Sequence, residues 1–383
     1  MAEYLFAASA VSVGWSGYFV GLMGDLGVHL PAALTQAPFA AGEGHALVST
    51  GALVNLPAVC IVALIASILV LGVSQSAAFN AAIVCLKVAV VVLVIVFGFL
   101  YAQPENWTPF IPPVETDPAT GASRYGVPGI FAAAGVIFFA YLGFDTVSTA
   151  AQEARDPQRT MPIGILGSLA VCTVLYILMC FAMTGMAPFR LLNVPAPIYA
   201  AVDHVGPRLA WLKPVVTVTA TVGLGTTLLA LLYGQSRIFY AMARDGLLPP
   251  LFARVHSTRR TPWVGTLITA VIAGTFGGLF PIGLLGELVS VGTLLAFALI
   301  CAGVMYLRVK EPGLQRGFKA PLWQVTAPLG ILSCIYLIAQ LPGVTFVRLL
   351  VWMAIGLAVY FGYAYRHAHN GVLSVAPAPR DGV

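Results

Sequence analysis

Charged side chains are scarce in this sequence. Of its 383 residues only 9% are Asp, Glu, Lys or Arg, whereas 59% are hydrophobic and the mean hydropathy is +0.92. Soluble domains carry about 25% charged residues, so this composition excludes a soluble globular domain. The chain is therefore expected to be an all-α polytopic membrane protein that lies in the lipid bilayer.

Metal-binding and redox motifs are also missing. Without a His cluster, a paired carboxylate or a Ser/Lys dyad at recognisable spacing, the sequence gives little support for a membrane enzyme. We expect no catalytic residue, no metal site and no cofactor, and we expect the thiols to be buried rather than paired in disulfides. The cysteines all fall in apolar runs and show no CxxC spacing: Cys60, Cys85, Cys172, Cys180, Cys301 and Cys334.

Long runs of apolar residues make up most of the sequence. A helix needs about 20 residues to cross the hydrocarbon core of a bilayer. The first run follows the start of the chain without the basic stretch of a cleaved signal peptide, so we expect it to be a span. Ten runs are long enough, near residues 3–24, 51–71, 79–101, 128–152, 163–187, 214–240, 264–282, 287–307, 322–341 and 344–365.

The loops between these runs differ in positive charge. If the N-terminus is cytoplasmic, thirteen Lys and Arg residues fall on the cytoplasmic side and four on the other. The positive-inside rule then predicts a multi-pass protein of the plasma (inner) membrane with both termini cytoplasmic. This asymmetry explains the net charge of +5 without a nucleic-acid partner. We expect one membrane domain, residues 1–367, and a disordered cytoplasmic tail, residues 368–383.

The fourth run contains an unusual stretch, FFAYLGFDTVST. Ala140 and Gly143 interrupt its apolar pattern, and Asp145 is a candidate N-cap for a second helical half. Membranes tolerate a broken spanning helix only where the break lines a cavity or ligand site. We predict that residues 139–144 depart from continuous α-helix and that half-helix carbonyls there can accept an ammonium group. The alternative is that the small residues serve close helix packing.

Lys87 is the second polar feature deep in an apolar run. It lies about ten residues into the third run, or roughly 15 Å along a helix, which is near the bilayer midplane. A lysine there must face a polar interior, where burial favours the uncharged amine and makes proton exchange possible. The alternative is a structural lysine bonded to helix-end carbonyls. Ionisable groups inside membranes are functional by default, which favours the first interpretation.

The sixth run offers hydroxyl groups to the same interior. Thr226 and Thr227 can point there, or each can bond to its own helix backbone. Gly225 beside them is expected to border the substrate space and to leave room for a large substrate side chain. Glu287, at the start of the eighth run, is expected to complement a helix N-terminus rather than to bind a ligand.

Five segments carry a family resemblance: EYLFAASAVSVGWSGY, NAAIVCLKVAVVVL, FFAYLGFDTVSTAAQEARDPQRTMPIGI, GQSRIFYAMARDGLLP and ELVSVGTLLAF. Together they resemble the amino acid-polyamine-organocation (APC) superfamily, and within it the cationic-amino-acid-transporter-like permeases. The resemblance implies a leucine-transporter-like fold with two inverted five-helix repeats, of which the second is complete at residues 128–307.

The resemblance also implies a function, a secondary active transporter that moves an amino acid by alternating access and is coupled to protons. In such a protein Lys87 and Thr227 would serve proton coupling. The residues implied to line the substrate site are Phe138, Phe139, Ala140, Tyr141, Gly143, Gly225 and Thr226.

One departure from the family pattern leaves a second hypothesis open. Family members have twelve spans, and this sequence resembles them from their third span onward, without the Gly-rich broken helix that holds the substrate carboxylate in the family. The alternative is therefore a truncated, non-transporting remnant or assembly subunit. The substrate side chain also stays open: Asp145 and Glu287 are the acidic candidates for binding a cationic one, and small or neutral amino acids are equally compatible.

Overall fold

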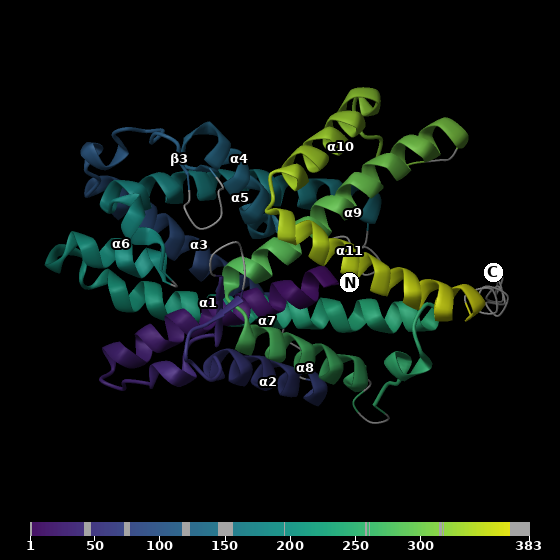
Figure 1. Ribbon diagram of the computed structural model, residues 1–383, viewed down its shortest axis with the longest axis horizontal. Coiled ribbons are helices and arrows are strands. Elements are labelled where there is room, and N and C mark those ends of the chain that lie inside the picture. The colour runs from purple at the N-terminus through teal and green to yellow at the C-terminus, as the bar shows by residue number, and fades with distance from the viewer. Residues whose placement is uncertain are drawn as a thin grey trace.

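The computed structural model describes residues 2–41, 47–72, 77–116, 123–144, 156–194, 196–256, 259, 261–313, 316 and 318–367. Regular structure in these residues is almost entirely helical (Figure 1). The α-helices are α1 (Ala2–Asp25), α2 (Leu56–Leu71), α3 (Ala77–Leu100), α4 (Gly126–Ile137), α5 (Pro157–Met186), α6 (Pro197–Val205), α7 (Leu212–Arg244), α8 (Trp263–Leu279), α9 (Ile282–Lys310), α10 (Trp323–Ala339) and α11 (Gly343–Val359).

Short elements fill the connections between these helices. Two small antiparallel hairpins pair β1 (Phe39–Ala41) with β2 (Leu47–Ser49) and β3 (Glu115–Thr116) with β4 (Ser123–Arg124). The remaining short helices are η1 (Ala32–Leu34), η3 (Pro104–Trp107), η4 (Phe138–Tyr141), η6 (Phe189–Leu192), η7 (Pro207–Leu209), η8 (Pro250–Ala253) and the π-helical η9 (Tyr360–Ala364).

The apolar helices follow the ten predicted spans. Among the described residues, six helices are long and apolar enough to cross a membrane: α1, α3, α5, α7, α9, and α11 with its extension. Four shorter apolar helices occupy the remaining predicted runs: α2, α4 with η4, α8 and α10. The prediction of an all-α polytopic membrane protein is confirmed.

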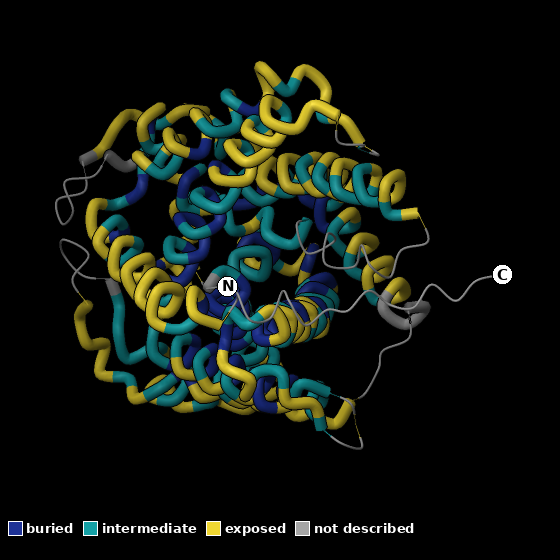
Figure 2. Tube along the Cα trace, turned by 90° about the vertical axis from the view of Figure 1, so that its right-hand side faces the viewer, coloured by how far each residue is buried: buried dark blue, intermediate teal, exposed yellow. Residues whose placement is uncertain are grey.

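Helix α1 runs through the middle of the bundle, where it packs against α7, α8 and α9 (Figure 1). Figure 2 shows buried segments in the interior and exposed segments around the outside. Small residues let neighbouring backbones approach closely, and on α8 Gly277 meets α1 so closely that an added Cβ would collide with Ser12 Oγ. The buried small residues of α1 include Ala7, Ala8, Ser9, Ala10 and Ser12.

Helix α6 was not predicted from the sequence. It is only nine residues long and its apolar residues lie on one face, so it lacks the long apolar run that identifies a span. Ala201 and Val202 on that face are fully buried. They belong to a cluster with Leu212 and Val216 at the start of α7.

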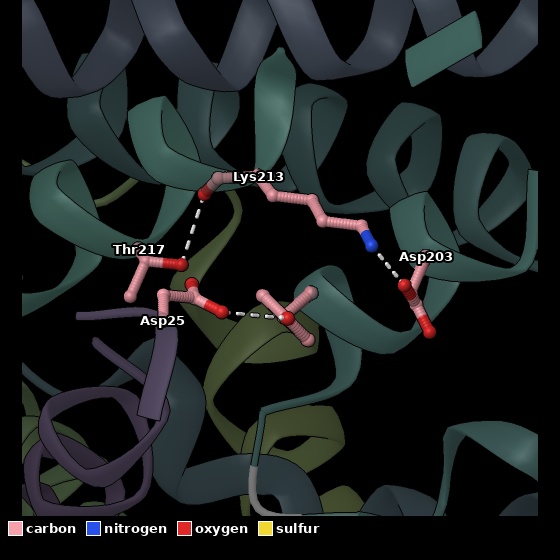
Figure 3. Close-up of polar contacts among 5 residues, drawn as sticks. Asp25, Asp203, Lys213 and Thr217 are labelled. Carbon is pink, nitrogen blue, oxygen red and sulfur yellow. Dashed lines mark hydrogen bonds and ion pairs between the residues drawn. The ribbon is translucent and has the colours of Figure 1, made fainter. Parts of the chain in front are cut away.

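Polar contacts fasten α6 to the end of α1 and the start of α7 (Figure 3). The Tyr199 hydroxyl donates a hydrogen bond to Asp25 Oδ1 at 3.1 Å, and Lys213 forms an ion pair with Asp203. Burial, followed by the bond to Asp25, raises the pKa of Tyr199 above its ordinary value. The Thr217 hydroxyl bonds back to the Lys213 carbonyl at 2.9 Å, which completes the group drawn in the figure.

The expectation of buried thiols is wrong for most of the cysteines. All six are free, but four lie exposed on helix surfaces, Cys301 is half-buried and only Cys334 is buried. Exposure of apolar side chains on the outside of this bundle is general, because a surface that contacts lipid does not need to be polar. The four exposed cysteines are Cys60, Cys85, Cys172 and Cys180.

Gln235 on α7 is a buried polar side chain with no partner among the described residues. Its exposed fraction is 0%, and neither amide atom forms a hydrogen bond. Such a group costs roughly 1–3 kcal/mol, so Gln235→Leu should raise the free energy of unfolding by about 1 kcal/mol. Thermal melting of the purified protein measures this. Gln235→Glu keeps the size and the polarity and should give no gain; a lower melting temperature for Gln235→Leu would contradict the prediction.

Candidate functional site

The fourth predicted span is interrupted where the sequence indicated. Helix α4 ends at Ile137 and continues as the 3-10 helix η4. Leu142 then adopts an extended ψ of 137°, and Gly143 has a φ of 121°, a left-handed conformation that favours glycine. The prediction of a break at residues 139–144 is confirmed. The proposed N-cap Asp145 lies outside the described residues.

A serine from α9 binds the backbone at this break. Ser290 is fully buried. Its hydroxyl donates to the Val136 carbonyl at 2.7 Å and accepts from the Phe139 amide at 3.1 Å. Membranes tolerate broken helices where neighbouring side chains satisfy the freed backbone groups, and Ser290 satisfies two of them.

A tyrosine from α5 binds the next backbone carbonyl. The Tyr176 hydroxyl donates to the Ala140 carbonyl at 2.7 Å, and its ring stands edge-on to Tyr141 with the ring centroids 5.3 Å apart. The Phe139 carbonyl accepts from the Leu142 amide at 3.0 Å. Each carbonyl oxygen has two lone pairs, so the break retains acceptor capacity beyond these bonds.

The two phenylalanines of the break point to different neighbours. The Phe139 ring lies on Gly286 of α9, where an added Cβ would come within 3.0 Å of it. Phe138 instead packs edge-on against Phe297, with a centroid separation of 6.0 Å, in a cluster formed by α9 and α10. Phe139 thus faces the central core and Phe138 the α9–α10 side.

Lys87 of α3 lies against α7. Its side chain covers Gly223, where an added Cβ would be 3.0 Å from Cε and 3.4 Å from Cδ. The hydroxyls of Thr226 and Thr227 both bond to the Gly223 carbonyl, at 2.9 and 3.1 Å. Lys87 and the two threonine hydroxyls thus contact the same glycine, and each threonine bonds to its own helix, as the alternative interpretation held.

Gly225 lies opposite an aromatic pair on α1. An added Cβ would be 3.8 Å from Trp15 Nε1, and Trp15 stacks on Phe19 with 4.7 Å between the ring centroids. Trp15 and Phe139 both pack against the same central cluster of buried residues. The contacts of the described residues thus form two groups, one around Lys87 and Gly223 and one between the break, α1 and α9.

The expected role of Glu287 at the start of its own helix is wrong. This residue of α9 does not serve the helix N-terminus, because it pairs with α11: its Oε2 lies 3.2 Å from Arg348 Nη1 and accepts from Thr345 Oγ1 at 2.9 Å. Its side chain is 13% exposed and that of Arg348 is 22% exposed. The Glu287 carboxylate is therefore already paired with the Arg348 guanidinium.

Four residues of these two groups were missed by sequence reasoning: Trp15, Tyr176, Gly223 and Ser290. Trp15 and Ser290 lie within EYLFAASAVSVGWSGY and ELVSVGTLLAF, the segments that carried the family resemblance, so a signal for them was present. For Tyr176 and Gly223 the sequence holds no local signal, because their partners lie on other helices.

An all-α bundle with an apolar helix interrupted at residues 138–143 and a lysine among its apolar helices is typical of membrane transporters. A model of the amino acid permease family matches residues 2–365. The chain belongs to this family, whose members are permeases and not enzymes.

Bacterial and plant relatives agree with this assignment. The chain is 42% identical to the methylthioribose transporter of Bacillus subtilis over 368 residues, which cover 96% of this chain and 75% of the relative. It is also 42% identical to the branched-chain amino acid permease BcaP of the same organism, over 367 residues with the same coverage. A chloroplastic cationic amino acid transporter 9 of Arabidopsis thaliana is 36% identical over 311 residues, which cover 81% of this chain and 52% of the relative.

Proposed function

We propose that this permease is a secondary amino-acid transporter that works by alternating access and moves protons with its substrate. The proposal rests on the broken helix at residues 138–143. Ser290 of α9 and Tyr176 of α5 bind its backbone groups there. It sits in the plasma membrane with both termini in the cytoplasm, as the distribution of Lys and Arg predicts.

The substrate site lies at the break and extends to α1 and α7. The ammonium group binds to backbone carbonyls of the break, and the substrate side chain lies toward Gly225. Phe139, Tyr141 and Trp15 provide aromatic surface there. Of the residues predicted to line the site, we assign Phe139, Ala140, Tyr141, Gly143, Gly225 and Thr226 to it, whereas the Phe138 ring packs toward α9 and α10.

Neutral, apolar amino acids fit this lining best. The side chains nearest to Gly225 and Gly286 are the aromatic rings of Trp15 and Phe139, respectively. Glu287 is already paired with Arg348. A cationic substrate side chain would need an acidic partner, and the described residues assigned to this lining include none. One relative is named for branched-chain amino acids, which agrees with an apolar site.

Proton coupling is assigned to Lys87, with Thr227 beside it on α7. The lysine bridges α3 and α7 through its contact with Gly223. When it is charged, its ammonium needs polar partners to offset the loss of hydration; when it is neutral, that need is smaller. Each protonation state therefore favours a different arrangement of the helices.

Uptake into proteoliposomes tests the proposed function. The purified 383-residue chain is reconstituted, and uptake of radiolabelled leucine, arginine and methylthioribose is compared with that of protein-free vesicles. We expect leucine uptake to exceed that of arginine. If only methylthioribose is taken up, this chain shares its substrate with the methylthioribose transporter of Bacillus subtilis. If none of the three compounds is taken up, the result supports a non-transporting role.

Gly225 is expected to set the size of the accepted side chain. Gly225→Met fills the space in front of Trp15, so it should reduce leucine uptake at least tenfold, a loss of about 1.4 kcal/mol, while alanine uptake is retained. Gly225→Ala is the graded control and should have a small effect. Equal uptake of small and large substrates by Gly225→Met would show that this glycine serves helix packing alone.

A further inference from the structure

Ser290 replaces hydrogen bonds that an unbroken helix would make for itself. In a continuous α-helix the Phe139 amide would bond to the Gly135 carbonyl, and the Val136 carbonyl would accept from the Ala140 amide. Here both groups bond to one serine hydroxyl, at 3.1 and 2.7 Å. A side chain inserted into the hydrogen-bond ladder is an established cause of sharp helix kinks.

The surroundings fix this hydroxyl in place. Ser290 is 0% exposed, so no water or lipid competes for its two bonds. One turn earlier on α9, the Phe139 ring lies so close to Gly286 that a Cβ added there would be 3.0 Å from it. The same residue of the break is therefore held twice by α9, through its amide and through its ring.

We propose that Ser290 is a positioning residue for substrate binding, which sets the geometry of the segment at residues 138–141. This proposal rests on the proposed function, because that segment is the assigned substrate site. Ser290 acts through the backbone of Phe139 and Val136 and does not touch the substrate. Tyr176 holds the following carbonyl from α5, so the break is fixed from two sides.

Hydrogen–deuterium exchange of the backbone tests the positioning step without any transport assay. Removing one net hydrogen bond should speed exchange of a peptide covering residues 136–142 roughly fivefold in Ser290→Ala. Ser290→Thr keeps the hydroxyl and should restore slow exchange. The matched control is Thr293→Val on the same helix, because the buried Thr293 hydroxyl bonds within α9, to the Val289 carbonyl at 2.9 Å, and to no other helix among the described residues.

The kinetics of leucine uptake then distinguish a positioning role of Ser290 from a general effect on protein stability. In Ser290→Ala we expect the KM for leucine to rise about fivefold with Vmax nearly unchanged, whereas Thr293→Val keeps both values. Unchanged exchange at residues 136–142, or an equal increase in α1 peptides, would overturn the proposal. Faster exchange with an unchanged KM would overturn the role in substrate binding. Absence of wild-type uptake would count against the proposed function only, since the exchange result stands by itself.

Discussion

Replacement of Lys87 by alanine is expected to abolish uptake driven by an inward proton gradient while the protein stays folded. A lysine in the middle of a span costs about 2.5 to 3.5 kcal/mol on insertion scales, so its removal should not impair folding. Loss of the exchangeable proton removes the step that links pH to the helix arrangement. Leucine uptake into proteoliposomes, with and without an imposed pH gradient, measures the effect.

Three further substitutions distinguish the roles of charge, proton exchange and packing at Lys87. Lys87→Arg keeps the positive charge but cannot release its proton, so it should lose gradient-driven uptake as well. Gly223→Ala places a methyl group 3.0 Å from Lys87 Cε and should weaken coupling, whereas Gly234→Ala on the same helix meets nothing within 4 Å and should not. If Lys87→Ala still accumulates leucine under a pH gradient, the lysine is structural.

Breaking the pair between Glu287 and Arg348 is expected to cause the largest loss of stability. Both side chains are mostly buried between α9 and α11, and removal of one partner leaves an uncompensated charge. Arg348→Ala should lower the free energy of unfolding by about 3 kcal/mol, seen as a clear decrease of the melting temperature.

The double substitution Glu287→Leu with Arg348→Met provides the matched comparison. It removes both charges and keeps the volume, which is often neutral for a buried pair. We expect it to melt near the wild-type temperature. A double variant as unstable as Arg348→Ala would show that the loss comes from packing of the arginine stem and not from the isolated carboxylate.

The spans were predictable because each is encoded by a local run of apolar residues. Helix α6 was not, since its nine residues gain stability from contacts with α1 and α7 that no local pattern records. The cysteines show a further limit. Hydropathy places a residue in a span, but it does not tell a face that packs in the interior from one that contacts lipid.

Only those parts of the candidate site that are marked within their own segment could be predicted from the sequence. Gly143 indicated the break through its conformational freedom, and Lys87 was a charged residue among apolar neighbours. Ser290 lies 154 residues from Val136, to which it bonds, and Glu287 lies 61 residues from Arg348. Pairings at such distances follow from the packing of whole helices, which periodicity along one segment does not specify.

Coupling of leucine movement to a proton gradient can be measured in an accumulation experiment. Proteoliposomes with the wild-type chain are diluted into acidic buffer, and internal leucine is followed against time, with a protonophore added in a parallel sample. We expect leucine to accumulate above the external concentration and this accumulation to collapse when the protonophore is added. Leucine that only equilibrates across the vesicle membrane, at the same rate with and without the gradient, would contradict it.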